Sequence, residues 1–132
     1  MAKQQKQPTR KLTLAEELLA LADRLQQRYT KAKTLFLEAV QMNPADGVAW
    51  HGEEMAKVQE PHERLMHILA YMKDQTPEAA LRDIIDEVDR RIEGFFGSQS
   101  TSLFQNAVER ARTEGLVALK RDLDFLARKY KV

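Results

Sequence analysis

The chain contains no cysteine, and this absence excludes several kinds of chemistry at once. Disulfide bonds, thiolate metal sites and cysteine nucleophiles all need a cysteine sulfur, so none of them can stabilise or activate this protein. Its fold must therefore be held together by packing and by polar contacts. The absence also fits a reducing compartment, and we expect a cytoplasmic protein.

Long apolar runs are missing as well. No stretch approaches the roughly 18 consecutive apolar residues of a membrane-spanning helix, so no membrane partner is expected. The first eleven residues, MAKQQKQPTRK, include no large apolar residue after Met1 and lack the apolar core of a secretory signal. We predict that residues 1–11 form a flexible basic tail and that residues 12–132 form a single helical domain.

Glycine and proline are scarce, with five and four among 132 residues, and no segment alternates polar and apolar residues as a strand would. The chain is therefore predicted to be all-α. Its apolar residues recur at helical spacing, and the few prolines and glycines divide them into five or six helices of a compact bundle. The expected helical segments are 14–42, 46–60, 61–74, 77–96 and 103–130, with a bend or break at Gly115 in the last.

Two short segments carry specific signals for the start of a helix. Thr13 and Glu16 have the spacing of a capping box, in which the two side chains satisfy free backbone donors of the first turn. Thr76 precedes Pro77, and a hydroxyl cap followed by proline at the first helical position is a typical helix start. We expect helices to begin directly after both threonines.

The segment 14–42 has neither glycine nor proline, and its apolar residues form a stripe with heptad-like spacing. The stripe consists of Leu18, Ala22, Leu25, Tyr29, Ala32, Phe36 and Ala39. An uninterrupted stripe of this kind favours one long helix that turns this face toward a core.

Part of the same region resembles a tetratricopeptide repeat. The resemblance rests on Tyr29, Ala32, Phe36, Ala39 and Pro44, which match the second half of a unit, and on Trp50 at the tryptophan position of a following unit. It covers one degenerate unit, about residues 13–50, since Ala20 and Gln27 stand where glycines are expected. The resemblance implies a helical hairpin that turns near Gln27, within a scaffold that binds other proteins. One long helix and a hairpin both remain open.

No residue pattern indicates an enzyme, a cofactor or a metal site. His62 and His67 surround Glu63 in a sequence similar to the zinc-protease motif, but histidines five residues apart point in different directions on a helix. Glycine-rich phosphate loops and nucleophile elbows are absent from the sequence. We therefore predict a protein without catalytic activity, cofactor or metal.

A cluster of acidic residues occurs at 83–93, where arginines are interleaved with it. The acidic members are Asp83, Asp86, Glu87, Asp89 and Glu93, and the basic ones are Arg82, Arg90 and Arg91. Asp86 with Arg90 and Glu87 with Arg91 have the spacing of favourable ion pairs within one helix. The pattern predicts a solvated helix face that neutralises its own charge.

The predicted function is that of a small interaction module, which binds a protein partner through a helical surface. An adaptor, a chaperone-like protein or a regulatory subunit would fit this description, and a homodimer is one state it could take. The candidate partner-binding residues are aromatic: Tyr29, Phe36, Trp50, Phe95, Phe96 and Phe104.

The alternative function is association with nucleic acid. The net charge is +1, but residues 1–43 carry +4, residues 44–96 carry −6 and residues 97–132 carry +3. Basic segments at both ends can contact phosphates. The candidate contacts are Lys3, Lys6, Arg10, Lys11, Arg24, Arg28, Lys31, Lys120, Arg121, Arg128, Lys129 and Lys131.

Overall fold

The computed structural model describes residues 11–42, 47–96 and 103–132, except for the side chains of residues 95–96 and 103–105. Within these residues the chain forms helices and no strand, which confirms the all-α prediction. The predicted tail lies outside the described residues apart from Lys11.

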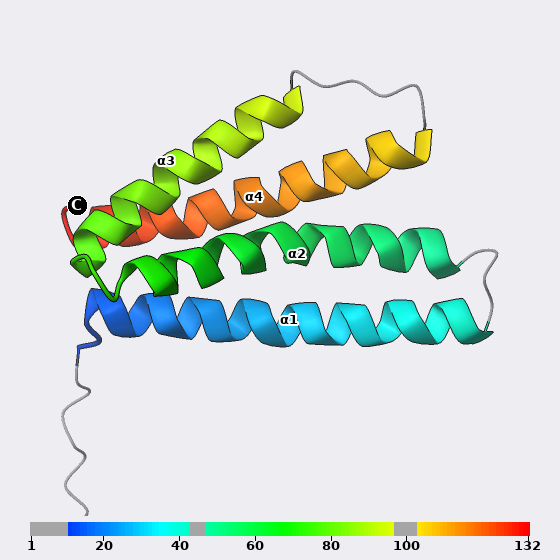
Figure 1. Cartoon of the computed structure of the whole chain (residues 1–132), viewed down its shortest axis with the longest axis horizontal. Coiled ribbons are helices and arrows are strands. Elements are labelled where there is room, and N and C mark those ends of the chain that lie inside the picture. Colours follow the sequence, from blue (N-terminus) through cyan, green and yellow to red (C-terminus); the bar gives the residue numbers. More distant parts are fainter. Residues whose placement is uncertain (1–10, 43–46, 97–102) are drawn as a thin grey trace, which may run out of the picture.

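Four helices form the bundle: α1 (Leu14–Met42), α2 (Gly47–Tyr71), α3 (Pro77–Phe96) and α4 (Leu103–Lys129). They lie side by side, with α2 between α1 and α4 along much of its length (Figure 1). The prediction of five or six helices is wrong, because α2 and α4 continue through Pro61 and Gly115, where the sequence indicated boundaries.

The first helix settles the question left open by its sequence. α1 continues through Gln27 without interruption, so the one-helix interpretation is confirmed and the turn expected near Gln27 is not formed. Pro44, the last residue of the tetratricopeptide-like pattern, lies outside the described residues.

Both predicted helix caps are confirmed. The Thr13 hydroxyl accepts a hydrogen bond from the backbone N–H of Glu16, and the Glu16 carboxylate accepts one from the backbone N–H of Thr13, each at 3.2 Å. At the start of α3, the Thr76 hydroxyl accepts a hydrogen bond from the N–H of Ala79 at 3.2 Å. These contacts satisfy donors that the first helical turn leaves free.

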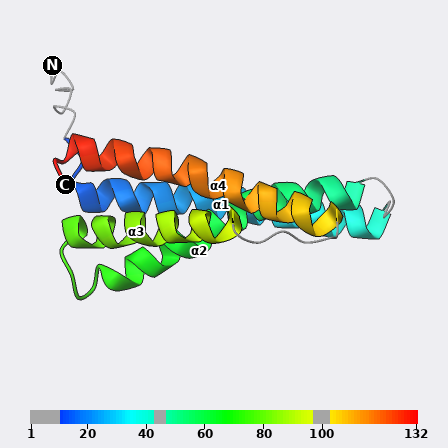
Figure 2. The same cartoon turned by 90° about the horizontal axis from the view of Figure 1, so that it is seen from above.

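Proline and glycine meet where α2 and α4 cross. Pro61 has no N–H, so the carbonyl of Lys57, four residues earlier, lacks its usual partner within the helix. Gly115 of α4 lies against that carbonyl: a Cβ atom on Gly115 would be 1.9 Å from the Lys57 oxygen. α2 bends near its middle (Figure 2), as expected for an internal proline. The glycine therefore allows two helices to approach closely instead of interrupting one of them.

The buried core lies at one end of the bundle and includes residues from all four helices. The largest fully buried side chains are Leu18, Leu65, Ile68, Leu81, Ile84, Val88, Leu116 and Leu123. On α1, the last buried residue is Leu25, and the stripe residues from Tyr29 to Ala39 are only half-buried. α3 ends well before the far ends of α1 and α2 (Figure 1). We name that far region, residues 29–42 and 47–55, the distal end.

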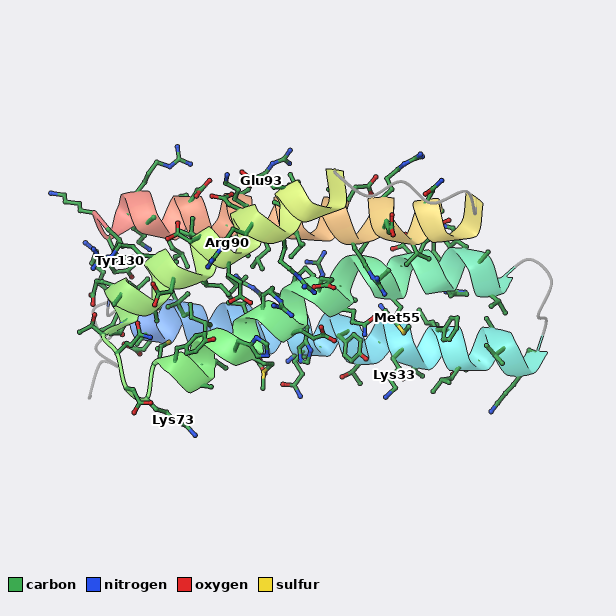
Figure 3. The ribbon with its side chains drawn as sticks, turned by 45° about the horizontal axis from the view of Figure 1, so that its top comes forward. Lys33, Met55, Lys73, Arg90, Glu93 and Tyr130 are labelled. Atoms are coloured by element: carbon green, nitrogen blue, oxygen red, sulfur yellow. The ribbon has the colours of Figure 1, made fainter. Side chains whose placement is uncertain are left out.

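The C-terminal segment contacts the start of α1 (Figure 3). Lys129 donates a hydrogen bond to the Glu17 carboxylate at 2.9 Å, and the Tyr130 hydroxyl donates one to the carbonyl of Leu12 at 2.6 Å. The Glu17 carboxylate is a second acceptor beside this hydroxyl, and hydrogen bonding to it raises the pKa of Tyr130 to about 12. Hydrogen bonding from Tyr130, and then from Lys129, lowers the pKa of Glu17.

Removal of the Glu17 charge should make stability less dependent on pH. Because the folded-state pKa of Glu17 is lowered, its contribution is present above its ordinary value of 4.5 and is lost as pH falls through the lowered value. We expect Glu17→Gln to reduce the free energy of unfolding by about 0.5 kcal/mol at pH 7, as for a solvent-accessible ion pair, and by less at pH 3. Urea unfolding at both pH values measures this.

The control is Glu38→Gln, which removes a carboxylate from an exposed position of the same helix. Its effect should not show this dependence on pH. An equal loss for Glu17→Gln at pH 7 and pH 3 would contradict the role assigned to its charge.

Candidate functional site

Two of the three aromatic candidates near the distal end pack between α1 and α2. The Tyr29 ring stacks on His62, with centroids 5.0 Å apart and an angle of 11° between the rings. The Phe36 ring lies over Gly52, where an added Cβ would be 3.5 Å from it. Both aromatic residues are half-buried, so they join the two helices and leave only part of their surface to a partner.

Trp50 is different because 59% of its surface is exposed. Its ring contacts His51 edge-on, with centroids 4.8 Å apart. Met55, by contrast, lies between α1 and α2, while Lys33 points away from them (Figure 3). The distal end thus presents its tryptophan to solvent, whereas Tyr29, Phe36 and Met55 are partly covered.

The second half of α1 adds further exposed apolar side chains. They are Leu35 (38% exposed), Leu37 (50%), Val40 (46%) and Met42 (85%). Contiguous exposed apolar surface is a frequent mark of a binding site, whereas single exposed apolar residues are ordinary. The sequence analysis singled out the aromatic residues here and missed these aliphatic ones, which lie outside the apolar stripe of α1.

A groove runs along one side of α1. α1 packs on α2, and α4 packs on α2 and α3, whereas α1 and α4 have little direct contact. Three hollows of about 320, 270 and 290 Å³ follow one another along α1. Residues of α4 line the first two, and the third lies between α1 and α2. Asp122 lines the first and second hollows, and Arg28 and Val58 line the second and third. We name this continuous feature the α1 groove.

Four cations line the α1 groove, and three of them form no ion pair with any described residue. Arg24, Arg28 and Lys31 line it from α1, are exposed, and form no ion pair with any described residue. Lys57, in contrast, is 3.2 Å from the Glu54 carboxylate and 3.7 Å from that of Glu114. Hydrogen bonding to Glu54 raises the pKa of Lys57.

Four carboxylates line the groove as well, those of Glu17, Glu54, Glu114 and Asp122, so the charges of its lining residues sum to zero. Glu17, at one end, is paired with Lys129, so it adds no free charge. Asp122 has no ion pair within the described parts of the chain. Among the described residues that line it, the α1 groove therefore has equal numbers of cations and carboxylates.

The basic candidates near the two ends of the chain divide into those that form ion pairs and those that are exposed. Lys120 forms an ion pair with Asp89, which raises the pKa of Lys120, and Lys129 pairs with Glu17. The remaining described candidates are exposed, namely Lys11, Arg121, Arg128 and Lys131. Lys3, Lys6 and Arg10 lie outside the described residues. Part of the basic charge counted from the sequence is thus already paired with carboxylates of the protein itself.

Phe95 and Phe96 are the last two residues of α3, and Phe104 is the second residue of α4. α3 ends at Phe96 and α4 begins at Leu103, but the side chains of the three aromatic residues are outside the described part of the chain. Their role in binding stays a prediction.

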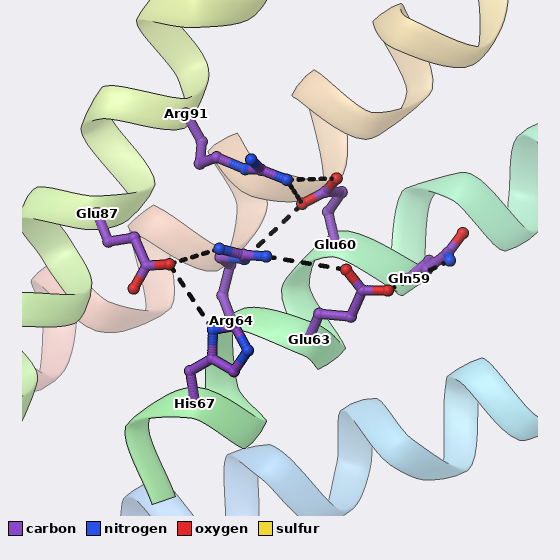
Figure 4. A network of polar contacts seen from close by, with 7 residues as sticks. All are labelled: Gln59, Glu60, Glu63, Arg64, His67, Glu87 and Arg91. Carbon is purple, nitrogen blue, oxygen red and sulfur yellow. Dashed lines mark hydrogen bonds and ion pairs between the residues drawn. The ribbon is translucent and has the colours of Figure 1, made fainter. Parts of the chain in front are cut away.

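A buried charge network joins α2 to α3 (Figure 4). Arg64 of α2 contacts Glu87 of α3, and Arg91 donates hydrogen bonds to both oxygens of Glu60 at 3.1 Å. Glu60 is also 3.8 Å from the Arg64 Nε atom. Glu60 and Arg64 are the two buried charged residues among those described. The network provides contacts between helices, and it differs from the ion pairs within α3 that the sequence indicated.

Sequence reasoning recognised Glu87 and Arg91 as charged residues of α3, but it missed their buried partners on α2, Glu60 and Arg64. The available signal was the four-residue spacing of Glu60, Arg64 and Ile68, which places two charges in line with a core residue. A charge on an apolar face needs a partner from another helix.

The three histidines lie in separate surroundings. His51 contacts Trp50, His62 stacks on Tyr29, and His67 is 3.9 Å from Glu87. Among the residues that the structure describes, no group of three or more possible ligands is placed to hold a metal ion. None of the helices, over their described residues, is long and apolar enough to cross a membrane.

No protein-family model, curated protein or solved structure matches this chain. In its described residues the molecule is a four-helix bundle with a partly covered distal end and a groove of mixed charge along α1.

Proposed function

We propose that this protein is a small interaction module, an adaptor or regulatory subunit, that binds a protein partner through the surface around Trp50. The observation that supports this most is the exposure of Trp50 at 59%, beside Leu35 in the third hollow of the α1 groove. Tryptophan is enriched among residues that dominate binding energy, since it buries a large area when a partner covers it.

The position of the core supports the same proposal. The distal end has its apolar side chains half-buried or exposed, while the fully buried core residues lie toward the opposite end of the bundle. Cover from a partner would remove this apolar surface from water, at roughly 25 cal/mol for each Å² buried. Tyr29, Ala32, Phe36, Ala39 and Trp50, which resemble positions of tetratricopeptide units, also belong to this region, and that family binds proteins.

Substitutions at the exposed apolar side chains should abolish partner binding without unfolding the protein. We expect Trp50→Ala and Leu35→Glu to weaken binding at least tenfold, because both residues lie in the same hollow and are largely solvent-exposed. The partner would be isolated with tagged full-length protein from its native cells and its affinity then measured with purified components.

Met66→Glu is the matched control, since Met66 is 42% exposed on the second half of α2. It should leave partner binding unchanged. The proposal fails if the wild-type protein has no stoichiometric protein partner, or if both hollow variants retain full affinity for it. Light scattering of the purified protein alone shows whether that partner is a second copy.

The alternative, association with nucleic acid, is supported by the unpaired row Arg24, Arg28 and Lys31. Binding of this kind would weaken steeply as salt concentration rises, because cations on phosphates release counterions. A salt series with random duplex and single strands separates the two functions. Absence of binding at low salt removes the alternative.

A further inference from the structure

We infer that the distal end is an interface between two copies of this protein, which pair through the outer face of α1. This inference rests on the proposed function, because it specifies the protein partner as a second copy. The exposed side chains of α1, the hollow beside them and the order of their charges are complementary to themselves.

The second half of α1 has four exposed residues on one face. They are Lys31, Leu35, Glu38 and Met42, spaced by 4, 3 and 4 residues. At 3.6 residues per turn, this spacing keeps them within a strip about 60° wide around the helix. Lys31 and Leu35 also line the third hollow of the α1 groove, so the strip borders that hollow. We name these four residues the distal row.

The charges of the distal row are complementary to those of a second, antiparallel row. In a symmetric dimer, a residue i that contacts residue j of the other copy has its own position contacted in the same way. With Leu35 opposite Leu35 of the second copy, Lys31 lies opposite Glu38 of that copy, since the two flank Leu35 at four and three residues. The symmetry produces two such ion pairs around a central apolar contact.

Both charges are available for this pairing. Lys31 and Glu38 are exposed, and neither forms an ion pair with any described residue. Opposite charges that meet across an interface determine its register and favour the correct partner. A second copy of the chain therefore supplies a partner that each of these two residues lacks within the bundle.

Met42 and the third hollow fit the same register. Met42 is 85% exposed, the highest value among the described large apolar side chains. In the antiparallel pair it lies opposite Arg28 of the second copy, at one end of a hollow of about 290 Å³ that Ala32, Trp50 and Val58 also line. Methionine is flexible and fills irregular apolar gaps. The chain thus has an exposed apolar side chain and a hollow that can receive it.

The other cations of α1 do not oppose this arrangement. In the proposed register the two Arg28 residues are about 21 Å apart along the helix axes, at 1.5 Å per residue, and the two Arg24 residues are further apart. These separations exceed the screening length of about 8 Å at physiological ionic strength. Like charges on the two copies are therefore kept apart, while Lys31 and Glu38 meet.

The dimer should be weak, because its contacts come mainly from residues 28–42 of α1 and from Trp50. Interfaces of small area are typical of transient complexes, so we expect a dissociation constant in the micromolar range. Dilute samples, such as those used for urea unfolding, then contain the monomer. Substitution of Glu38 should affect dimerisation without affecting the stability measured in dilute samples.

The test begins with the mass of the full-length protein over a concentration series, measured by analytical ultracentrifugation. We expect the mass to rise from that of one chain, 15.2 kDa, to twice that value. Because Trp50 is the one tryptophan of the chain and lines the third hollow, its emission should shift to the blue over the same range.

Charge reversal then tests the register. Lys31→Glu and Glu38→Lys should each raise the dissociation constant of the dimer at least tenfold, because each places like charges opposite one another. An equimolar mixture of these two variants should dimerise as the wild type does, since the acidic positions of one variant then face the basic positions of the other. A contact elsewhere on the surface would not show this rescue.

Lys33→Glu is the matched control, since Lys33 is exposed on the same helix but points away from α1 and α2 (Figure 3). It should dimerise as the wild type does. Circular dichroism on heating confirms that each variant remains folded. The inference is overturned if the mass stays that of one chain at every concentration, if both single charge reversals dimerise normally, or if their mixture does not regain dimerisation.

Failure here and failure of the proposed function give different results. A protein that remains monomeric but binds a different protein, and loses it with Trp50→Ala, would overturn this inference and leave the proposed function standing. If Trp50→Ala and Leu35→Glu affect neither self-association nor the binding of any other protein, both proposals fail.

Discussion

Gly115→Ala should destabilise the protein by about 3 kcal/mol, although alanine is the better helix former by about 1 kcal/mol. The added methyl group would lie 1.9 Å from the Lys57 oxygen and 2.8 Å from its carbonyl carbon. Both atoms belong to the backbone, so a change of side-chain rotamer cannot relieve the contact. α4 must move away from α2, and the core between them would loosen. Denaturant unfolding followed by circular dichroism measures the loss.

Gly94 provides the control for this substitution. It also lies inside a helix, α3, but a Cβ atom there would have nothing within 4 Å. We expect Gly94→Ala to stabilise the protein by about 0.5–1 kcal/mol, through helix propensity alone. If the two substitutions change stability in the same direction, the close approach at Gly115 does not govern its effect.

Glu60→Leu is the second large effect that we expect, with a loss of about 3 kcal/mol in the free energy of unfolding. The Glu60 side chain is 9% exposed and lies between two guanidinium groups, those of Arg64 and Arg91. Its removal leaves the Arg64 charge, which is 11% exposed, with less compensation in a poorly hydrated place. Arg91 is 43% exposed and can turn toward water, so Arg64 accounts for most of the cost.

Two further variants decide whether burial of the charge is the cause. Glu63→Gln removes another carboxylate near Arg64, 3.8 Å away but 45% exposed, and should cost less than about 1 kcal/mol. Glu60→Leu combined with Arg64→Leu should be more stable than Glu60→Leu alone, since no buried cation remains on α2. Equal stability of the single and double variants would show that lost packing, rather than an uncompensated charge, explains the effect.

Local sequence rules were sufficient for the helical class and for the helix starts at Thr13 and Thr76, because these depend on neighbours within one turn. They were insufficient at Pro61 and Gly115. Each of these residues weakens a helix on its own, yet the carbonyl of Lys57, which Pro61 leaves without its helical partner, lies against Gly115, 58 positions later in the sequence. No local pattern reports on such a pair.

In the candidate site, too, the sequence predicted local features but not contacts between helices. Helical spacing identified the face of α1 that contains Tyr29 and Phe36, but spacing cannot tell whether another helix covers it. α3 is too short to do so, and the face stays half-covered (Figure 1). Likewise, Glu87 and Arg91 have the spacing of a pair within α3, but buried partners on α2 compete for both. The α1 groove depends on the separation of α1 from α4 and had no signal in the sequence.

The core ends at Leu25, so the two halves of the unbroken helix α1 have different roles. Residues before that position determine whether the protein folds, because they contact every other helix or the core that those helices share. Residues after it contribute less to folding and more to the outer surface. Substitutions can therefore accumulate in the second half and change what the protein recognises, while selection for a stable bundle acts mainly on the first.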